Sequence, residues 1–367
     1  MKSITSIKSL QNKIVLLRAD FNVPIENGKV RDAFRIEKTL PTIDYLVKKG
    51  ARIIIVSHAG EDGSVSLQPV ATWLSKKMKV RFITDPLPNA IEFNTTKIVL
   101  LENIRQNSGE MNNDRTFAKK LARLADVYVN DAFSVSHRKH ASLVLIPKLL
   151  PSYAGLQVME EVKHLSLILK PKHPFLFILG GAKFDTKMPL IDKFIQSADH
   201  MLITGALMNN FFKDAGFEIG KSLYEPKDFH LQKLLKTPKL LLPVDVVVTQ
   251  KDGGKQTKSI AEITSKDIIV DIGSRTVQEV ALLIAKAKLV VWNGPTGLYE
   301  KGFDRGTRGV LELLVKSKAT TIIGGGDTVA LVHKLHLEKK FTFVSTGGGA
   351  TLAFLTKGTL PGLKALE

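Results

Sequence analysis

The sequence predicts an α/β fold made of two doubly wound domains with mainly parallel sheets, joined by a helix. Three observations carry this prediction. Short apolar runs rich in Val, Ile and Leu alternate with segments of helical periodicity along nearly the whole chain. The alternation occurs in two series, which are separated by a helical pattern over residues 156–170 that ends in the proline-containing sequence KPKHP. A length of 367 residues also favours two domains.

The first series consists of five predicted strands with helical patterns between them. The strands cover residues 14–20, 51–58, 80–84, 97–103 and 127–133, and the helical patterns include residues 33–50 and 115–125. Four of these strands carry a polar residue near their ends, namely Asp20, His58, Asn103 and Asp131. Because ligands of open α/β sheets bind beyond the carboxyl ends of the strands, we expect a functional site at these positions.

The second series indicates a second doubly wound domain of similar size. Its seven predicted strands cover residues 174–181, 200–206, 239–248, 267–274, 288–295, 320–327 and 341–349. The stretch from Thr320 to Leu335 is the most informative of these, since a β-branched run, three glycines, an aspartate and an amphipathic segment follow one another. This order predicts a strand, a Gly-rich turn and a helix.

A Gly-rich turn of this kind favours phosphate binding, because its unshielded backbone N–H groups and the helix N-terminus both attract negative charge. Asp327 would repel a bare phosphate but suits a metal ion that bridges phosphates. A single such turn is more often an ordinary capped connection. Here, however, four glycine-containing turns follow predicted strands, and their repetition favours a nucleotide: Gly180–Gly181, Gly294–Gly297, Gly324–Gly326 and Gly347–Gly349. None has the G-x-G-x-x-G spacing, which disfavours the alternative of a dinucleotide-dependent dehydrogenase.

The first series supplies cationic side chains in or just after its strand ends. They are Arg18, Arg35, His58, Arg105, His137, Arg138 and His140. A single arginine of this kind is more often part of a surface ion pair, whereas for the whole set a small polyanion is an equally good explanation, since arginine binds carboxylate and phosphate bidentately. Together the two series suggest phosphoryl transfer between a nucleotide on one domain and a small anion on the other.

Composition limits the other classes of function. The chain has no cysteine, which excludes disulfides, thiolate metal sites and thiol catalysis and suits a cytoplasmic location. No apolar run approaches the roughly 18 residues of a membrane span, and we see no secretory signal. The net charge of +18 leaves nucleic-acid binding as an alternative, but the lysines are spread along the chain without a basic tail, which favours a solvated basic surface.

Nine segments resemble the phosphoglycerate kinase family, in the family's order and over nearly the whole chain. They are LLRADFNVP (16–24), SHAG (57–60), LLENIR (100–105), VYVNDAF with HRKHAS (127–142), PFLFILGGAKFDTK (174–187), VVWNGPTGLYE (290–300), GTRG (306–309), IIGGGDT (322–328) and VSTGGGA (344–350). The resemblance implies a monomeric, cytoplasmic enzyme of glycolysis with two Rossmann-like domains and a hinge helix. It also implies reversible transfer of the acyl phosphate of 1,3-bisphosphoglycerate to Mg-ADP, giving 3-phosphoglycerate and ATP.

The resemblance further implies which residues form the site. Binding of phosphoglycerate falls to Asp20, Asn22, Arg35, His58, Arg105 and Arg138. Binding of ATP or ADP falls to Gly181, Lys183, Lys187, Gly205, Asn293, Glu300, Gly324, Gly325, Gly326, Asp327 and Thr328, with Asp327 as the Mg²⁺ ligand. The attacking oxygen is already ionised at neutral pH, so no general base is needed; catalysis falls to the cations Arg35, Lys183 and Lys187, which neutralise the phosphoryl group in transfer once a hinge motion closes the two domains.

The resemblance also predicts domain limits and draws attention to departures. Residues 1–155 would bind phosphoglycerate, 156–170 would form the hinge helix, 171–356 would bind the nucleotide, and 357–367 would pack back on the first domain. Glu61 and Asp62 replace an arginine and a proline that are usual in the family, so substrate affinity is expected to be weaker unless a nearby cation such as Arg31 compensates. Ser274 replaces a proline and Ser134 a glycine, and segments around 61–67 and 84–97 are short for the family.

Overall fold

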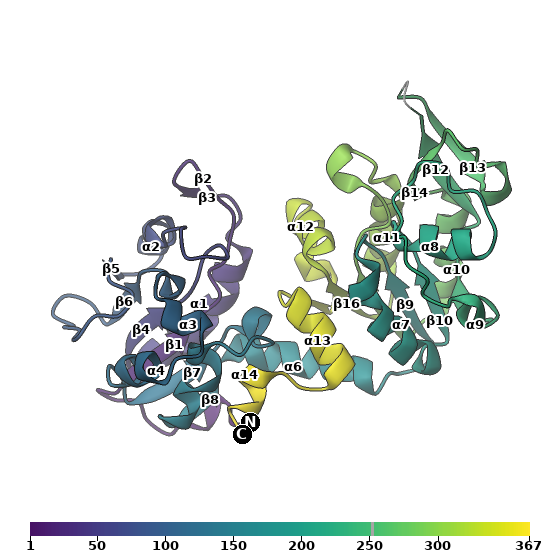
Figure 1. Cartoon of the computed structure of the whole chain (residues 1–367). Coiled ribbons are helices and arrows are strands. Elements are labelled where there is room, and N and C mark those ends of the chain that lie inside the picture. Colours follow the sequence, from purple (N-terminus) through teal and green to yellow (C-terminus); the bar gives the residue numbers. More distant parts are fainter. Residues whose placement is uncertain (251–252) are drawn as a thin grey trace. The chain divides into compact units, whose positions relative to one another are not determined.

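The computed structural model describes residues 1–250 and 253–367 (Figure 1). The chain divides into two compact units. Unit 1 comprises Met1–Lys163 and Lys357–Glu367, and unit 2 comprises His164–Thr356. Helix α6 (Leu156–Leu169) contains the point at which the chain passes from unit 1 to unit 2. The α/β class predicted from the alternating pattern is confirmed, while the domain limits at residues 155, 171 and 357 stay predictions.

Unit 1 is built on a six-stranded parallel sheet with the order β5-β6-β4-β1-β7-β8. Its strands are β1 (Ile14–Arg18), β4 (Arg52–Val56), β5 (Arg81–Ile83), β6 (Ile98–Leu101), β7 (Val127–Asn130) and β8 (Ser152–Ala154). All five strands predicted in the first series are present, and each is shorter than the predicted range. Strand β8 was not predicted, since its three residues, Ser-Tyr-Ala, carry no apolar pattern of their own.

A hairpin of β2 (Ile25–Glu26) and β3 (Lys29–Val30) also escaped prediction. Its signal was present in the sequence, because Asn27 and Gly28 are the residue pair that tight hairpin turns prefer. Both adopt positive φ angles, 50° and 69°, as such a turn requires.

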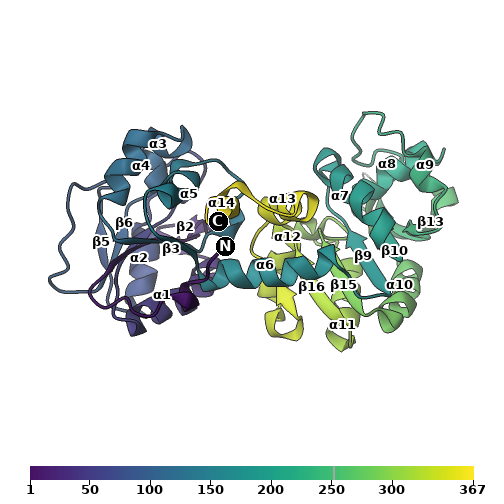
Figure 2. The same ribbon diagram turned by 90° about the horizontal axis from the view of Figure 1, so that it is seen from below.

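Helices cover both faces of the unit 1 sheet. Right-handed crossovers that run in opposite directions along the sheet, here from β1 to β4 and from β6 to β7, place their helices on opposite faces. Figure 2 accordingly shows α1 (Phe34–Lys48) on one side of the sheet and α4 (Arg115–Ala122) on the other. The remaining helices are α2 (Gln68–Ser75), α3 (Ser108–Met111) and α5 (Ala141–Val144). The main core lies between the sheet and α1, and burial of each such side chain contributes about 1.5–3 kcal/mol; it includes Val15, Leu17, Ile53, Ile55, Ile36, Ile43 and Leu46.

Unit 2 contains a six-stranded parallel sheet with the order β11-β10-β9-β15-β16-β17 and a separate three-stranded antiparallel sheet, β13-β12-β14. The parallel strands are β9 (Phe175–Leu179), β10 (His200–Ile203), β11 (Leu240–Leu241), β15 (Leu289–Asn293), β16 (Thr320–Gly324) and β17 (Phe343–Val344). The antiparallel strands are β12 (Asp245–Thr249), β13 (Lys255–Ser259) and β14 (Ile268–Ile272).

The second sheet corrects part of the prediction. The run 239–248, predicted as one strand, is divided into β11 and β12, because Pro243 interrupts it and has no N–H for a strand ladder. The run 267–274 forms β14 and pairs with β12 in the small sheet instead of joining the parallel one. Strand β13 was not predicted, since its sequence KQTKS is polar and largely exposed.

The helices of unit 2 also lie on both faces of its parallel sheet. Figure 2 shows α7 (Phe184–Ser197) on one face and α10 (Ser274–Lys286) with α11 (Arg305–Lys316) on the other. The others are α8 (Leu207–Asp214), α9 (Gln232–Leu235), α12 (Gly326–Lys334) and α13 (Gly349–Lys357). The order of β16, glycine turn and α12 confirms the strand–turn–helix prediction for residues 320–335.

The two chain termini lie close together in unit 1, as both ribbon views show (Figures 1 and 2). The last helix, α14 (Pro361–Lys364), packs against α5. The backbone N–H of Gly362 donates to the carbonyl oxygen of Ser136 at 2.8 Å. Unit 1 is therefore completed by residues from the far end of the chain.

Candidate functional site

The cationic residues predicted in the first series gather at one edge of the unit 1 sheet. Arg18 is the last residue of β1, His58 follows β4, and Arg105 lies in a short 3-10 turn after β6. Carboxyl ends of parallel strands meet at the same edge, which brings these side chains together. Their proximity affects protonation: burial lowers the pKa of His58 well below its usual value, and the charges of Arg18, Arg105 and Arg35 lower it further.

Asp20, Asn22 and Arg35 form one hydrogen-bonded group. The guanidinium of Arg35 lies 3.2 Å from the Asp20 carboxylate and donates to the Asn22 carbonyl oxygen, also at 3.2 Å. The Asn22 side-chain oxygen in turn accepts from the backbone N–H of Gly60 at 3.0 Å. Ser134 donates its hydroxyl to Oδ2 of Asp20, the same oxygen that Arg35 contacts. Arg35 is thus held in place before any ligand arrives.

Arg105 is anchored to the backbone that carries Glu61. Its guanidinium donates to the carbonyl oxygens of Gly60 at 2.6 Å and Glu61 at 3.2 Å. Burial and the charges of Arg18 and Arg138 lower the pKa of Arg105, while the Glu61 carboxylate acts in the opposite direction. The acid that departs from the family pattern therefore lies near an arginine of the site and reduces its positive potential.

The position of Arg31 gives no support to a compensating role. Its guanidinium forms an ion pair with Glu26 at 3.0 Å in the β2–β3 hairpin, and both side chains are more than half exposed. An exposed pair of this kind contributes little to stability and keeps the Arg31 charge occupied locally.

The two histidines after β7 add little charge at neutral pH. Burial lowers the pKa of His140 to about 4, and the charges of Arg105, Arg18 and Arg138 act in the same direction. Burial and the charge of Arg138 also lower the pKa of His137. The positive charge of this edge therefore comes from its arginines.

In unit 2 the glycine turns serve two purposes. Some let backbones approach one another: a Cβ at Gly180 would lie 2.3 Å from the carbonyl oxygen of Pro295, and a Cβ at Gly205 would lie 2.6 Å from the amide nitrogen of Gly181. Gly326, at the start of α12, faces open space instead. The first kind packs strand ends tightly, and the second leaves backbone N–H groups accessible to a ligand.

Lys187, Asn293 and Asp327 form a polar group beside these turns. The buried ammonium of Lys187 donates to the side-chain oxygen of Asn293. Burial lowers the pKa of Lys187 to about 8, against the opposing effect of the Asp327 charge. Within the described residues, the Asn293 amide nitrogen and the Thr328 hydroxyl are buried without a hydrogen-bond partner. Such groups are costly in a free protein and suit a ligand that supplies acceptors.

The remaining predicted residues lie around the same strand ends. Gly324 is the last residue of β16, and Gly325 precedes α12 with a φ of 89°. Asp327 lies exposed in the first turn of α12. A cavity of about 430 Å³ adjoins this edge, and four predicted residues line it: Gly181, Gly205, Glu300 and Asp327.

The polar residues of this cavity that sequence reasoning missed include Asn209 and Tyr299. Asn209 is buried, donates to the Leu223 carbonyl oxygen at 2.8 Å, and has a side-chain oxygen without a partner in the part of the chain that the structure describes. Burial and the charges of Asp327 and Glu300 raise the pKa of Tyr299 to about 12. The pair Asn209 and Asn210, set between apolar residues of α8, was the available signal for Asn209.

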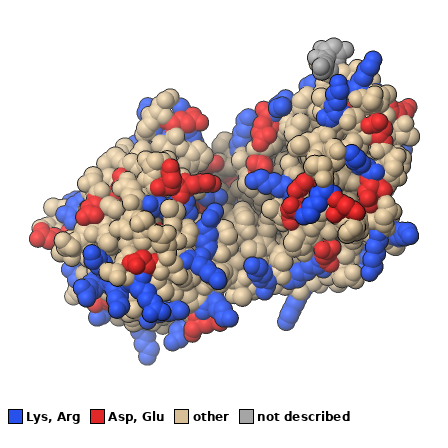
Figure 3. All heavy atoms as spheres, in the orientation of Figure 1, with Lys and Arg blue, Asp and Glu red and all other residues tan. Residues whose placement is uncertain are grey.

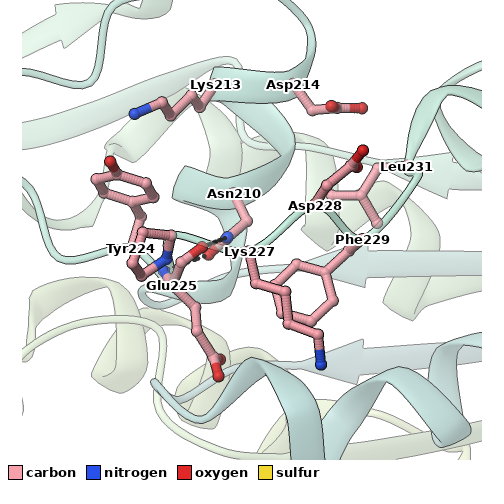
Figure 4. Close-up of a pocket in the computed structure, with 10 residues that line it drawn as sticks. Asn210, Lys213, Asp214, Tyr224, Glu225, Lys227, Asp228, Phe229 and Leu231 are labelled. Carbon is pink, nitrogen blue, oxygen red and sulfur yellow. Dashed lines mark hydrogen bonds between the residues drawn. The ribbon is translucent and has the colours of Figure 1, made fainter.

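A second hollow, of about 450 Å³, lies between α8 and the segment 224–231 (Figure 4). Lys213 and Tyr224 lie together on one side, with the Lys213 ammonium 3.7 Å from the ring centre. The Glu225 carboxylate accepts from the backbone N–H groups of Phe184 and Asp185 at 3.0 and 3.3 Å. It thereby caps α7 directly after Lys183, which is exposed at the start of that helix.

Two features are absent from the described residues, 1–250 and 253–367. No group of three or more His, Asp or Glu side chains there could hold a metal ion without further ligands. None of the helices in these ranges is long and apolar enough to cross a membrane.

Comparisons with known proteins identify the family of the chain. The sequence profile of the phosphoglycerate kinase family matches residues 4–358. The phosphoglycerate kinase of Wolbachia sp. subsp. Drosophila simulans is 42% identical over 396 residues, covering 100% of this chain and 99% of the relative. That of Leptospira biflexa is 40% identical over 383 residues, covering 98% of this chain and 96% of the relative.

A solved structure is similarly close. The phosphoglycerate kinase from Coxiella burnetii superposes with a TM-score of 0.87 at 38% identity, covering 99% of this chain and 98% of that one. Profile, relatives and fold all extend over nearly the whole length, so the chain belongs to the phosphoglycerate kinase family.

Proposed function

We propose that unit 1 binds the phosphoglycerate substrate and unit 2 binds the nucleotide. As a member of its family, the chain is a glycolytic kinase that reversibly transfers the acyl phosphate of 1,3-bisphosphoglycerate to ADP, giving 3-phosphoglycerate and ATP. The observation that carries the division of roles is the chemistry of the two sites. Arginines surround a histidine at one, and glycine turns adjoin a buried lysine and unpaired donors at the other.

In unit 1, Arg35, Arg105 and Arg138 supply charge, and Asn22 and His58 supply hydrogen bonds to phosphoglycerate. Both ligand-independent contacts of Arg35 use the same guanidinium nitrogen, Nη1, which leaves its other donors for an anion. Asp20 orients this guanidinium and is also proposed as a ligand of phosphoglycerate.

In unit 2, Lys187 and the unpaired donors of Asn293 and Thr328 bind phosphate oxygens, together with the N–H groups of the Gly324–Gly326 turn. Bringing acceptors to buried unpaired donors recovers about 1–3 kcal/mol for each donor. Lys183 is exposed at the start of α7 and is the cation proposed to follow the phosphoryl group in transfer. Gly181, Gly205 and Glu300 line the nucleoside side of the cavity.

Mg²⁺ fits this donor set through Asp327. The ion commonly binds one or two carboxylates and completes its shell with water and substrate phosphates, so a single exposed carboxylate beside a phosphate site is sufficient. When bound, it would neutralise phosphate charge during transfer.

The protein does not need to form a covalent bond with either substrate in this reaction. The attacking carboxylate or phosphate oxygen is already ionised, so positioning and charge neutralisation carry the catalysis. In-line transfer requires the two bound substrates to meet, and the proposal therefore includes hinge closure between the units.

The proposal also covers the setting of the enzyme: a cytoplasmic monomer that acts on small molecules, without nucleic-acid or membrane partners. Figure 3 shows Lys and Arg spread over the visible face among Asp and Glu, as for a solvated basic surface. The family assignment leaves the dehydrogenase alternative without support.

The test is a coupled assay with 3-phosphoglycerate and Mg-ATP on the wild type, Arg35→Ala and Lys183→Ala. Removing a cation that stabilises the transition state should lower kcat by about a hundredfold or more in each variant. Arg115→Ala and Lys233→Ala, exposed residues of the same types in α4 and α9, are matched controls and should keep wild-type kcat. Full activity of both test variants would refute the residue roles.

A further inference from the structure

We propose that Arg18 is a positioning residue that fixes His58 as a neutral imidazole with its proton on Nε2, so that His58 offers the anion site a hydrogen-bond donor and no charge. The consequence for substrate rests on the proposed anion-binding role of unit 1, whereas the effect of Arg18 on His58 stands without it.

Arg18 is immobilised by a buried network. Its side chain is fully buried at the end of β1. Nε donates to the Ser142 hydroxyl at 2.9 Å, and Nη1 donates to the Ala19 carbonyl oxygen at 2.7 Å. Nη2 lies 3.7 Å from the Glu110 carboxylate, which is also fully buried. A buried charge needs such a partner, so the guanidinium has one stable position.

Glu110 is itself held by Ser142. The backbone N–H of Ser142 donates to it at 2.8 Å, and the Ser142 hydroxyl donates at 2.6 Å. The serine hydroxyl therefore links the carboxylate and the guanidinium. Neither charged group can turn without breaking bonds to the other.

This arrangement decides the tautomer of His58. Nη2 of Arg18 lies 3.5 Å from Nδ1 of His58. A guanidinium carries only donors, so Nδ1 must be the acceptor and cannot carry a proton. The proton of a neutral imidazole then resides on Nε2, which is the donor that remains for a ligand.

The surroundings of His58 disfavour a second proton. The side chain is 1% exposed, and within the described part of the chain the titratable or charged groups that act on it are Arg18, Arg105, Arg35 and His140. None is a carboxylate, and burial together with these groups lowers the pKa of His58 well below its usual value. The fixed arginines thus provide the positive charge, and the neutral His58 provides one hydrogen-bond donor of defined orientation.

The test uses ¹⁵N NMR of histidine-labelled, ligand-free protein at pH 7, with the His58 signals identified by their loss in His58→Gln. We expect Nδ1 at the position of an unprotonated ring nitrogen and Nε2 at that of a protonated one. A protonated Nδ1, or both nitrogens protonated, would overturn the proposal without any reference to substrate.

Arg18→Met tests the cause, with Ser142→Ala as the second variant if the first does not fold. In a folded variant both ring nitrogens should shift toward values averaged between tautomers, and KM for 3-phosphoglycerate should rise about tenfold, as for one lost hydrogen bond to a charged group, with little change in kcat. Arg52→Met is the matched control, since Arg52 begins β4 at the opposite end of the sheet. Wild-type shifts in a folded variant would refute the role of Arg18.

Titration with 3-phosphoglycerate separates this inference from the proposed function. A shift of Nε2 on binding, with Nδ1 remaining unprotonated, supports both. An expected ligand-free spectrum without any response to saturating 3-phosphoglycerate would keep the Arg18–His58 relation and refute His58 as a substrate ligand.

Discussion

The proposed anion site of unit 1 and the proposed nucleotide site of unit 2 differ in how their charged and polar groups are paired before a ligand binds. In unit 1 the principal arginines already have partners, since Arg35 is paired with Asp20 and Arg18 with Glu110. In unit 2 the buried donors of Asn293 and Thr328 have none among the described residues, and burial depresses the pKa of Lys187. The first site is rigid through its own carboxylates; the second depends on its ligand to complete it. Substitutions should therefore affect the two sites differently.

The largest expected effect concerns the independence of the two units. Deleting residues 358–367 removes Leu360, Leu363 and Leu366, all buried, and at about 1.5–3 kcal/mol each the loss to unit 1 should be several kcal/mol. Unit 2 should be unaffected, and domain closure should weaken. The two tryptophans, Trp73 in α2 and Trp292 in β15, allow each unit to be followed separately during urea unfolding.

Each tryptophan is best measured with the other replaced by phenylalanine. An equal loss of stability in both units would show that they do not unfold independently. Unchanged stability and turnover in the truncated protein would refute the contribution of the C-terminal segment.

Next comes Lys187→Met, which tests the ligand-dependent site. It should lower kcat by about a hundredfold while leaving folding intact or improved, because a buried ammonium with a lowered pKa is costly in the free protein. Steady-state kinetics measure kcat, and thermal unfolding measures the stability of the same variant. A kcat within threefold of wild type, or a marked loss of stability, would mean that Lys187 is structural.

A pH comparison tests a buried carboxyl group in each unit. Asp131 accepts from the backbone N–H groups of Gln157 and Val158 at the start of α6, and Asp271 accepts from Thr296 and Gly306. Burial raises the pKa of Asp131 to about 7 and that of Asp271 to about 6. The folded state therefore binds these protons more tightly than the unfolded state does. The resulting stabilisation is complete when the pH is below the ordinary pKa of a carboxyl group. It is lost as the pH rises to and beyond the raised pKa of the folded state.

Between pH 5 and pH 8 the wild type should accordingly lose about 3 kcal/mol more stability than Asp131→Asn, and about 1 kcal/mol more than Asp271→Asn. Urea unfolding of the three proteins at both pH values measures this difference, whatever each substitution costs at a single pH. An identical pH dependence in all three would contradict the raised pKa values.

The smallest expected effect concerns the pre-paired site. Asp20→Asn weakens the contact that orients Arg35, so KM for 3-phosphoglycerate should rise about tenfold, with kcat reduced less. Glu26→Gln, which breaks the exposed pair with Arg31, is the control and should leave both constants unchanged. If Asp20→Asn left both constants unchanged, as the control should, the contact with Asp20 would not be needed to orient Arg35.

The sequence predicted what local pattern determines. Strands β1, β4 and β15 are apolar runs that must be buried on both faces, and α1 and α6 have unambiguous helical periodicity, so their positions followed directly. The hairpin at Asn27 was available from its turn residues and was missed. The division at Pro243 depended on recognising one proline within an apolar run.

The site was predicted residue by residue from the family motifs, but its internal partners were not. Nothing in the segment SGEM identifies Glu110 as a buried carboxylate, because its burial depends on Arg18, which is 92 positions away. Asn209 is similar, since its partner is the backbone of Leu223 on a separate segment. Long-range pairing of polar groups leaves no periodic signal in a sequence.

The C-terminal segment has a consequence for biosynthesis. A ribosome makes the chain from its N-terminus, and domains generally fold as units in the order of synthesis. Because Lys357–Glu367 belongs to unit 1, the unit that begins first cannot finish until all of unit 2 has been made. Unit 2 can complete its own core earlier, and a chain truncated before Leu360 would contain all of unit 2 together with a unit 1 that still lacks α14.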